Sequence, residues 1–190
     1  MKIDIGCGKK KREGYVGCDV RPIPGVDVVC LSTQLPFENG SIDEVYSRHI
    51  VEHFSFREFL DVLVEWNRVL KMGGEIYIIC PNLLWHAQQI LNGSHESVYD
   101  KRRGHNDRYW ALGSLFGWQQ DEYDIHKFGY YFELLKDVLE GAGFCLVENR
   151  TNQPDSYEKA QHHLEVRAHK VCDYTDANKH PMFELFTVEH

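Results

Sequence analysis

Short apolar runs separated by turns fill the first eighty residues. Ile3 and Ile5 flank Asp4 in the first run, and similar runs cover residues 15–20, 26–31, 42–47 and 75–80. Apolar runs of about four to eight residues, bounded by glycine, proline and asparagine, predict β-strands. The last of these runs, E-I-Y-I-I-C, is almost continuously apolar, which is typical of a strand covered on both faces.

Two later stretches have the spacing of amphipathic helices. The first follows Ser55-Phe56-Arg57-Glu58, which has the spacing of a capping box, and Gly73-Gly74 is expected to end it. Its apolar positions are Phe59, Leu60, Leu63, Trp66, Val69 and Leu70. The second helix is predicted by Tyr131, Leu134, Leu135, Val138 and Leu139, and stops at Gly141 and Gly143. A sixth strand over residues 144–148 and a half-exposed seventh strand near residues 164–169 follow.

Strands that alternate with helical or loop crossovers predict an α/β fold with a doubly wound parallel sheet. Only residues 9–14 separate the first turn from the second strand, too few for a helix with its loops. One face of the sheet is therefore expected to be thinly covered. Periodicity weakens over residues 85–128, where a short helix through residues 89–91 and an aromatic stretch suggest a lid or substrate-facing insertion in a single domain of residues 1–190.

Composition narrows the class of protein. The formal net charge of −8 argues against a general nucleic-acid binder, because binding phosphates requires basic surface. No apolar run approaches a membrane span, and the N-terminus lacks the apolar stretch of a signal peptide. None of the six cysteines forms a C-x-x-C pair, so they are interpreted as small buried hydrophobes in a reducing compartment. We therefore expect a cytoplasmic protein that contacts neither nucleic acid nor membrane; its oligomeric state is not predicted.

The candidate chemistry begins at the end of the first strand. Gly6-Cys7-Gly8 forms a turn there, and Asp19 stands near the end of the second strand. Doubly wound folds hold an adenosine in this way, with the turn against the ligand and the acid on the ribose hydroxyls. The pattern is G-x-G and not G-x-G-x-x-G, so the dinucleotide fingerprint is incomplete and a nicotinamide dehydrogenase is disfavoured.

Six motifs in order resemble class I S-adenosylmethionine-dependent methyltransferases of the type 11 kind. They are D-I-G-C-G (4–8), Y-V-G-C-D (15–19), L-P-F-E-N-G-S-I-D-E-V (35–45), V-E-H (51–53), R-V-L-K-M-G-G (68–74) and G-A-G-F (141–144). The short first crossover resembles a bacterial subgroup of these enzymes. The resemblance implies a Rossmann-like sheet of seven strands with the last strand antiparallel.

The resemblance also implies S-adenosyl-L-methionine as cofactor and assigns residues to it. Gly6 and Gly8 would let the methionine part cross the strand end, and Asp4 would order the turn. Asp19 would accept both ribose hydroxyls. The other predicted contacts are Ser32 and Leu35 beside the adenine and Arg48 at the amino-acid end. The family usually has an acid at the position of Leu31, and the basic run after Gly8 is atypical, although Lys9 or Lys10 would suit the cofactor's carboxylate.

A competing interpretation comes from His49-Ile50-Val51-Glu52-His53, which spells H-x-x-E-H, the inverted zinc-peptidase motif. Two histidines on one helical face can chelate zinc, with a glutamate as base. Here the motif straddles a strand-to-helix junction, since Ser55 marks the helix start only after it. His49 and His53 therefore need not share a face. We keep a zinc hydrolase as a minor alternative and assign no metal ligand.

Methyl transfer needs alignment more than covalent chemistry, because the sulfonium is already activated. A hydroxyl acceptor also needs a base, and histidine has a suitable pKa. His126 is the first candidate and His53 the second, ahead of His86 and His105. The N/D-P-P-Y signature of amide methylation is absent, which favours O-methylation of a small molecule or sugar.

The basic segment that includes Arg102 and Arg103 would suit an anionic substrate, although such runs are often only a solvated surface. A catalytically silent domain that binds the cofactor or a protein partner is the main alternative function.

Overall fold

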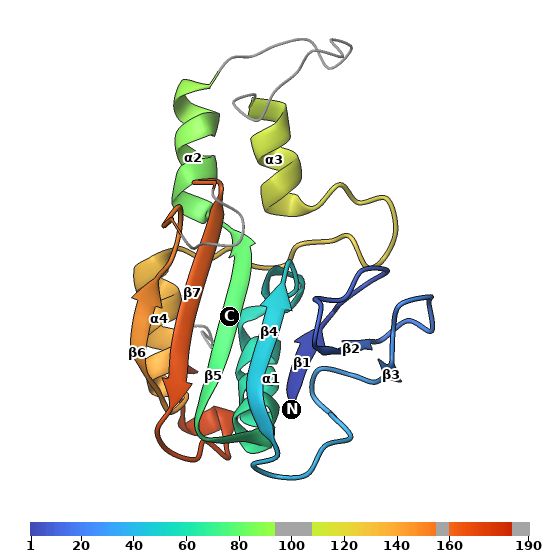
Figure 1. Cartoon of the computed structure of the whole chain (residues 1–190). Coiled ribbons are helices and arrows are strands. Elements are labelled where there is room, and N and C mark those ends of the chain that lie inside the picture. The colour runs from blue at the N-terminus through green and yellow to red at the C-terminus, as the bar shows by residue number, and fades with distance from the viewer. Residues whose placement is uncertain (94–107, 155–159, 184–190) are drawn as a thin grey trace.

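A seven-stranded mixed sheet forms the centre of the molecule in a computed structural model that describes residues 1–93, 108–154 and 160–183 (Figure 1). The strand order is β3-β2-β1-β4-β5-β7-β6. The strands are β1 (Lys2–Ile5), β2 (Val16–Asp19), β3 (Val28–Val29), β4 (Ile42–Arg48), β5 (Leu70–Pro81), β6 (Phe144–Asn149) and β7 (His163–Lys170).

The first five strands are parallel, and β7 runs antiparallel between β5 and β6. In register, Ile3 pairs with Val16 of β2 and with Val45 of β4. This arrangement confirms the predicted seven-stranded Rossmann-like sheet with its last strand antiparallel. The carboxyl ends of β1, β2 and β4 therefore meet at one edge, where doubly wound folds bind ligands.

Helices α1 (Phe56–Val69) and α4 (Phe132–Gly141) lie on the same side of the sheet (Figure 1). The predicted capping box begins α1: Ser55 Oγ accepts from the Glu58 N–H and the Glu58 carboxylate accepts from the Ser55 N–H. Buried side chains of both helices, such as Trp66 and Val138, form one core with the apolar residues of that sheet face. This core fixes the sheet that carries the site.

The opposite face has no helix in the parts of the chain that the structure describes. A row of tyrosines covers it instead: the Tyr15 and Tyr46 ring centroids are 5.9 Å apart, and those of Tyr46 and Tyr77 are 5.4 Å apart. The Arg12 guanidinium lies over all three rings, 4.6 Å from that of Tyr46. The first crossover contains no helix, so the expected thin covering is confirmed.

Helices α2 (Leu83–Asn92) and α3 (Arg108–Phe116) belong to the insertion between β5 and α4 and stand beyond the carboxyl end of β5 (Figure 1). Helix α2 extends well beyond the short helix predicted around residues 89–91. Helix α3 was not predicted, because its only buried side chain is Ala111 and no apolar face announces it in the sequence.

Four sequence predictions were wrong in detail. Helix α1 ends at Val69, four residues before Gly73, because Leu70 is already extended and begins β5. Strand β3 has two residues instead of six. Strand β7 is not half-exposed, because it lies inside the sheet, where Glu165 is buried and accepts a hydrogen bond from the Tyr77 hydroxyl at 2.5 Å. Finally, only two of the six cysteines, Cys18 and Cys80, are buried, and Cys172 is exposed.

Candidate functional site

The turn after β1 has the geometry that requires glycine. Gly6 and Gly8 have φ angles of +67° and +56°, a region that residues with a side chain seldom occupy. A Cβ atom on Gly6 would also lie 1.9 Å from Cδ1 of Ile50, which follows β4. A side chain at this position would displace Ile50, which packs directly against the turn, and the N–H groups of Gly6 and Cys7 donate to the Cys18 carbonyl oxygen.

Asp4 joins this turn to the basic loop that follows. Its buried carboxylate accepts a hydrogen bond from the Arg12 N–H at 2.7 Å. Burial raises the pKa of Asp4 to about 6, although the Arg12 hydrogen bond and charge act in the opposite direction. The position fits the ordering role expected for Asp4.

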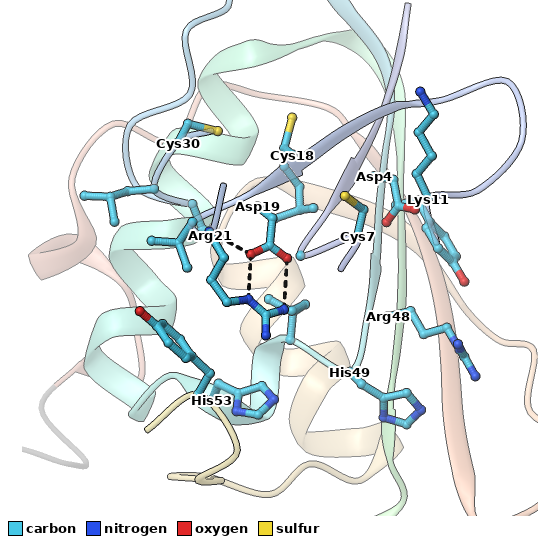
Figure 2. A pocket seen from close by; sticks show the side chains of 18 of the residues that line it. Asp4, Cys7, Lys11, Cys18, Asp19, Arg21, Cys30, Arg48, His49 and His53 are labelled. Atoms are coloured by element: carbon cyan, nitrogen blue, oxygen red, sulfur yellow. Dashed lines mark hydrogen bonds and ion pairs between the residues drawn. The ribbon is translucent and has the colours of Figure 1, made fainter. Parts of the chain in front are cut away.

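Asp19 faces the glycine turn, but Arg21 covers its carboxylate (Figure 2). Oδ2 accepts from the Gly8 N–H at 3.0 Å, and Oδ1 accepts from the backbone N–H and the Nε–H of Arg21 at 2.9 and 3.0 Å. Burial alone would raise the pKa of Asp19, but the hydrogen bonds from Arg21 and Gly8 hold it below its ordinary value. The ionised carboxylate suits two ribose hydroxyls once the guanidinium moves aside.

Arg21 was not among the site residues predicted from the sequence. Its only signal was its position two residues after Asp19, since side chains at i and i+2 of an extended segment share a face. The guanidinium also lies 5.3 Å from the ring centroid of Tyr123, in the segment between α3 and α4. Arg21 thus connects the Asp19 carboxylate to the insertion.

A cavity of about 960 Å³ opens at this edge of the sheet. Its size is at the upper end of the range for small-molecule sites, so it has room for a cofactor and an acceptor. Every predicted cofactor residue lines it except Gly8, whose N–H is used by Asp19: these are Asp4, Gly6, Asp19, Ser32, Leu35 and Arg48. Leu31, where the family usually has an acid, also lines the cavity, as does Lys10.

One wall of the cavity carries histidines from the segment that follows β4. His49 and His53 line it, and His126 lies against His53 with ring centroids 4.8 Å apart. The structure therefore brings both predicted catalytic residues together, with His53 nearer the cavity. Burial lowers the pKa of His126, although the Glu52 charge acts to raise it. A neutral imidazole at His126 is the form that accepts a proton.

The H-x-x-E-H segment does not form a helical zinc-peptidase site. His49 ends the strand in a left-handed conformation with φ +54°, and the 3-10 helix η1 (Val51–His53) follows. The Nδ1 atom of His49 contacts Oε1 of Glu52 at 3.2 Å instead of sharing a helical face with His53.

The remaining candidates lie elsewhere. Arg102, Arg103 and His105 are outside the described residues. His86 is buried away from the cavity, and burial lowers its pKa to about 4.

Comparisons with known proteins bear on the family and the fold of the chain. Residues 3–78 match the family model described as a methyltransferase domain. A possible histamine N-methyltransferase from Thermotoga maritima is 16% identical, with 89% of this chain and 81% of that chain covered and a TM-score of 0.57. An S-adenosylmethionine-dependent methyltransferase from Methanosarcina mazei is 16% identical, with 90% and 92% covered and a TM-score of 0.53.

A third solved structure contains ligands. The 1,6-didemethyltoxoflavin-N1-methyltransferase of Burkholderia thailandensis, with its substrate and S-adenosylhomocysteine bound, is 14% identical to this chain. The similarity covers 90% of this chain and 71% of that chain, with a TM-score of 0.55. No curated protein sequence matches. Within the described ranges, no helix is both long and apolar enough to cross a bilayer.

Proposed function

We propose that the chain is an S-adenosylmethionine-dependent methyltransferase that methylates a hydroxyl of a small molecule or sugar, on the premise that residues 3–78 match a methyltransferase domain and the chain shares the fold of such enzymes. One observation supports the proposal above all others. A single cavity runs from the glycine turn and Asp19 to His53, so one space adjoins both the cofactor residues and a candidate base. We propose a cytoplasmic location, which suits six free cysteines.

The residues present fit the cofactor. Gly6 and Gly8 give the chain the left-handed turn that the methionine part would cross at the end of β1. Asp19 would accept the ribose hydroxyls in place of the Arg21 guanidinium, and Ser32 and Leu35 would border the adenine. When bound, the cofactor supplies an activated methyl group on a sulfonium.

The chain's own contribution to the reaction is alignment and proton removal. We propose that an acceptor in the cavity places its hydroxyl against His53, with His126 behind it. An imidazole nitrogen would take the proton of the acceptor hydroxyl, which would leave its oxygen as the nucleophile toward the methyl group that the bound cofactor would supply. General-base catalysis of this kind contributes about 10²- to 10⁴-fold.

Two measurements test the proposal. Calorimetric titration with S-adenosylhomocysteine should show binding that falls at least about tenfold in Asp19→Asn, because a charged hydrogen-bond acceptor is lost. A methyl-acceptor screen should then find turnover that His53→Gln and His126→Gln reduce by about 10²-fold or more. The control is His169→Gln, at the opposite end of the sheet. Absence of cofactor binding by the wild-type chain refutes the proposal.

A catalytically silent binding module is the second candidate, because Arg21 occupies Asp19 and Leu31 replaces the usual adenine-contacting acid. Saturable binding of S-adenosylhomocysteine without turnover across the screen would support it.

The proposal that Arg102 and Arg103 bind an anionic substrate has its own test: Arg102→Ala and Arg103→Ala should raise the acceptor KM and leave cofactor affinity unchanged. Equal loss of both would reject it.

A further inference from the structure

Glu52, His53 and His126 each offer one ligand atom, and these atoms all lie within 4.8 Å of one another. We propose that the three residues bind a divalent transition-metal ion of the zinc class in the wall of the cavity. Binding of the ion is independent of the proposed function, whereas its role in methyl transfer rests on it. We call this set the Glu52–His53–His126 triad.

The two histidines are oriented as metal-bound histidines usually are. Nδ1 of His53 lies 3.1 Å from the Ile125 carbonyl oxygen, and Nδ1 of His126 lies 2.9 Å from that of Ser114. A carbonyl only accepts, so each Nδ1 must carry the hydrogen. Nε2 is then left with a free lone pair in both rings. Metal-bound histidines typically donate their second ring N–H to a backbone carbonyl in this way.

Glu52 supplies the third ligand, and the burial of its carboxylate is an independent indication of a bound cation. The residue is 2% exposed, and Oε1 lies 3.2 Å from Nδ1 of His49. Oε2 is buried and has no hydrogen-bond partner in the described part of the chain. A buried carboxylate oxygen without a partner is costly, and coordination to a cation would remove that cost. The contact with His49 orients the carboxylate as an outer-shell partner would.

Backbone hydrogen bonds hold the two halves of the triad together. The Glu52 carbonyl oxygen accepts from the N–H of Lys127 at 2.7 Å and from that of Phe128 at 3.2 Å. The Lys127 ammonium pairs with Glu58 at 3.0 Å, so it does not neutralise the Glu52 carboxylate. The segment with His126 is thus fixed against η1.

The donor set selects the kind of ion. Two imidazoles and one carboxylate suit zinc and its neighbours, whereas magnesium and calcium prefer oxygen ligands. Bonds of about 2.1 Å in tetrahedral geometry require ligand atoms about 3.4 Å apart, so the widest pair must close by about 1.4 Å or less. His53 lines the cavity, which leaves the fourth position toward an acceptor.

The consequence for the proposed reaction is a different route for the proton. An ion in the triad would lower the pKa of an acceptor hydroxyl bound to it, so that the proton leaves to water. The oxygen then forms its bond to the methyl carbon, and the electron pair of the breaking carbon–sulfur bond stays on sulfur. With the ion bound, the histidines hold it and do not take the proton; the imidazole route proposed above applies only to the site without the ion.

The test uses the full chain, stripped with chelator and titrated with Zn²⁺ and with Co²⁺. We expect one equivalent of Zn²⁺ to bind, and Co²⁺ to give the visible absorption of a four-coordinate nitrogen–oxygen site. Glu52→Gln and His126→Gln should each weaken binding at least about tenfold. The half-exposed His169 is the matched control, and His169→Gln should bind as the wild type does. Circular dichroism verifies folding, and either variant alone suffices if the other fails to fold.

Each outcome decides the question. No saturable Zn²⁺ binding by the wild type, or equal binding by the triad variants and the control, overturns the inference. Calorimetry with S-adenosylhomocysteine separates the two proposals. A chain that binds this ligand but no Zn²⁺ refutes the metal site alone, and a chain that binds Zn²⁺ but not this ligand refutes the proposed function alone.

Discussion

At the residue scale, Arg21 occupies the carboxylate of Asp19. Both Asp19 oxygens accept hydrogen bonds from Arg21, whose side chain is 37% exposed. Under the proposed function, ribose hydroxyls would compete with the guanidinium for these two oxygens. We therefore expect the ion pair with Arg21 to oppose cofactor binding by about the strength of a partly exposed salt bridge, up to about 1 kcal/mol.

Arg21→Ala should accordingly tighten binding of S-adenosylhomocysteine, by up to about fivefold for a pair of that strength. Isothermal titration calorimetry measures it directly. Arg150→Ala is a matched control, because Arg150 also pairs with a carboxylate two residues away, that of Glu148, and does not line the cavity. Weaker binding in Arg21→Ala would mean that the guanidinium contacts the cofactor instead of competing with it.

Asp4 makes stability depend on pH. Burial raises its pKa in the folded state from 3.8 to about 6, so the folded protein holds a proton that the unfolded chain has lost between those values. The contribution is fully favourable below about pH 4 and is lost as the pH rises through 6. A shift of about 2 units corresponds to roughly 3 kcal/mol.

The comparison that isolates this effect is wild type against Asp4→Asn. The free energy of unfolding of the wild type, relative to the variant, should fall by about 2 to 3 kcal/mol between pH 4 and pH 7. Urea denaturation at each pH measures it, and titrations shared by both proteins cancel. A difference that is constant with pH would contradict the raised pKa.

At the scale of elements, the Ser55–Glu58 capping box begins the helix that covers the centre of the sheet. Ser55→Ala removes the acceptor for the Glu58 N–H and should lower the free energy of unfolding by about 1 kcal/mol. Chemical denaturation measures the loss. Ser41→Ala, which removes an exposed hydrogen bond from Ser41 Oγ to the Glu38 carbonyl oxygen outside any helix, is the control and should stay within about 0.5 kcal/mol of the wild type. Equal effects of the two substitutions would mean that the cap is not formed.

The sequence predicts elements well where burial imposes a period. Strands β1 and β4 and helices α1 and α4 follow from apolar positions that face the core. It fails where tertiary contacts decide. Leu70 has a helical period but is drawn into β5, and α3 packs with so little burial that its residues show no periodic face.

The site follows the same rule. The glycine turn and Asp19 can be recognised in the sequence because they stand at the ends of two predicted strands. The meeting of His53 with His126 depends on how a long insertion returns to η1, through the hydrogen bonds that the Glu52 carbonyl accepts, and no spacing in the sequence encodes that. Both histidines were named as candidates from the sequence. Their contact with each other, and the ion pair of Arg21 with Asp19, could be seen only in the structure.

At the scale of the whole molecule, the ligand site spans the ends of several strands and the insertion. A ligand that binds only the folded state stabilises it by about 2.7 kcal/mol at a concentration of 100 times its Kd. For a chain of this length, S-adenosylhomocysteine should therefore raise Tm by roughly 5 to 10 °C. Scanning calorimetry measures the shift. Adenosine alone gives a smaller shift at equal concentration, and an unchanged Tm with both ligands would refute a cofactor site.

The contact of Arg21 with Tyr123 has a kinetic consequence. Under the proposed function we expect the ribose to displace the guanidinium from Asp19 and so to end its contact with Tyr123, in the segment that also places Ile125 beside His53. We therefore predict ordered addition, with the methyl donor first and the acceptor second. Initial-rate measurements would then show that S-adenosylhomocysteine, the demethylated donor, inhibits competitively against the donor and noncompetitively against the acceptor.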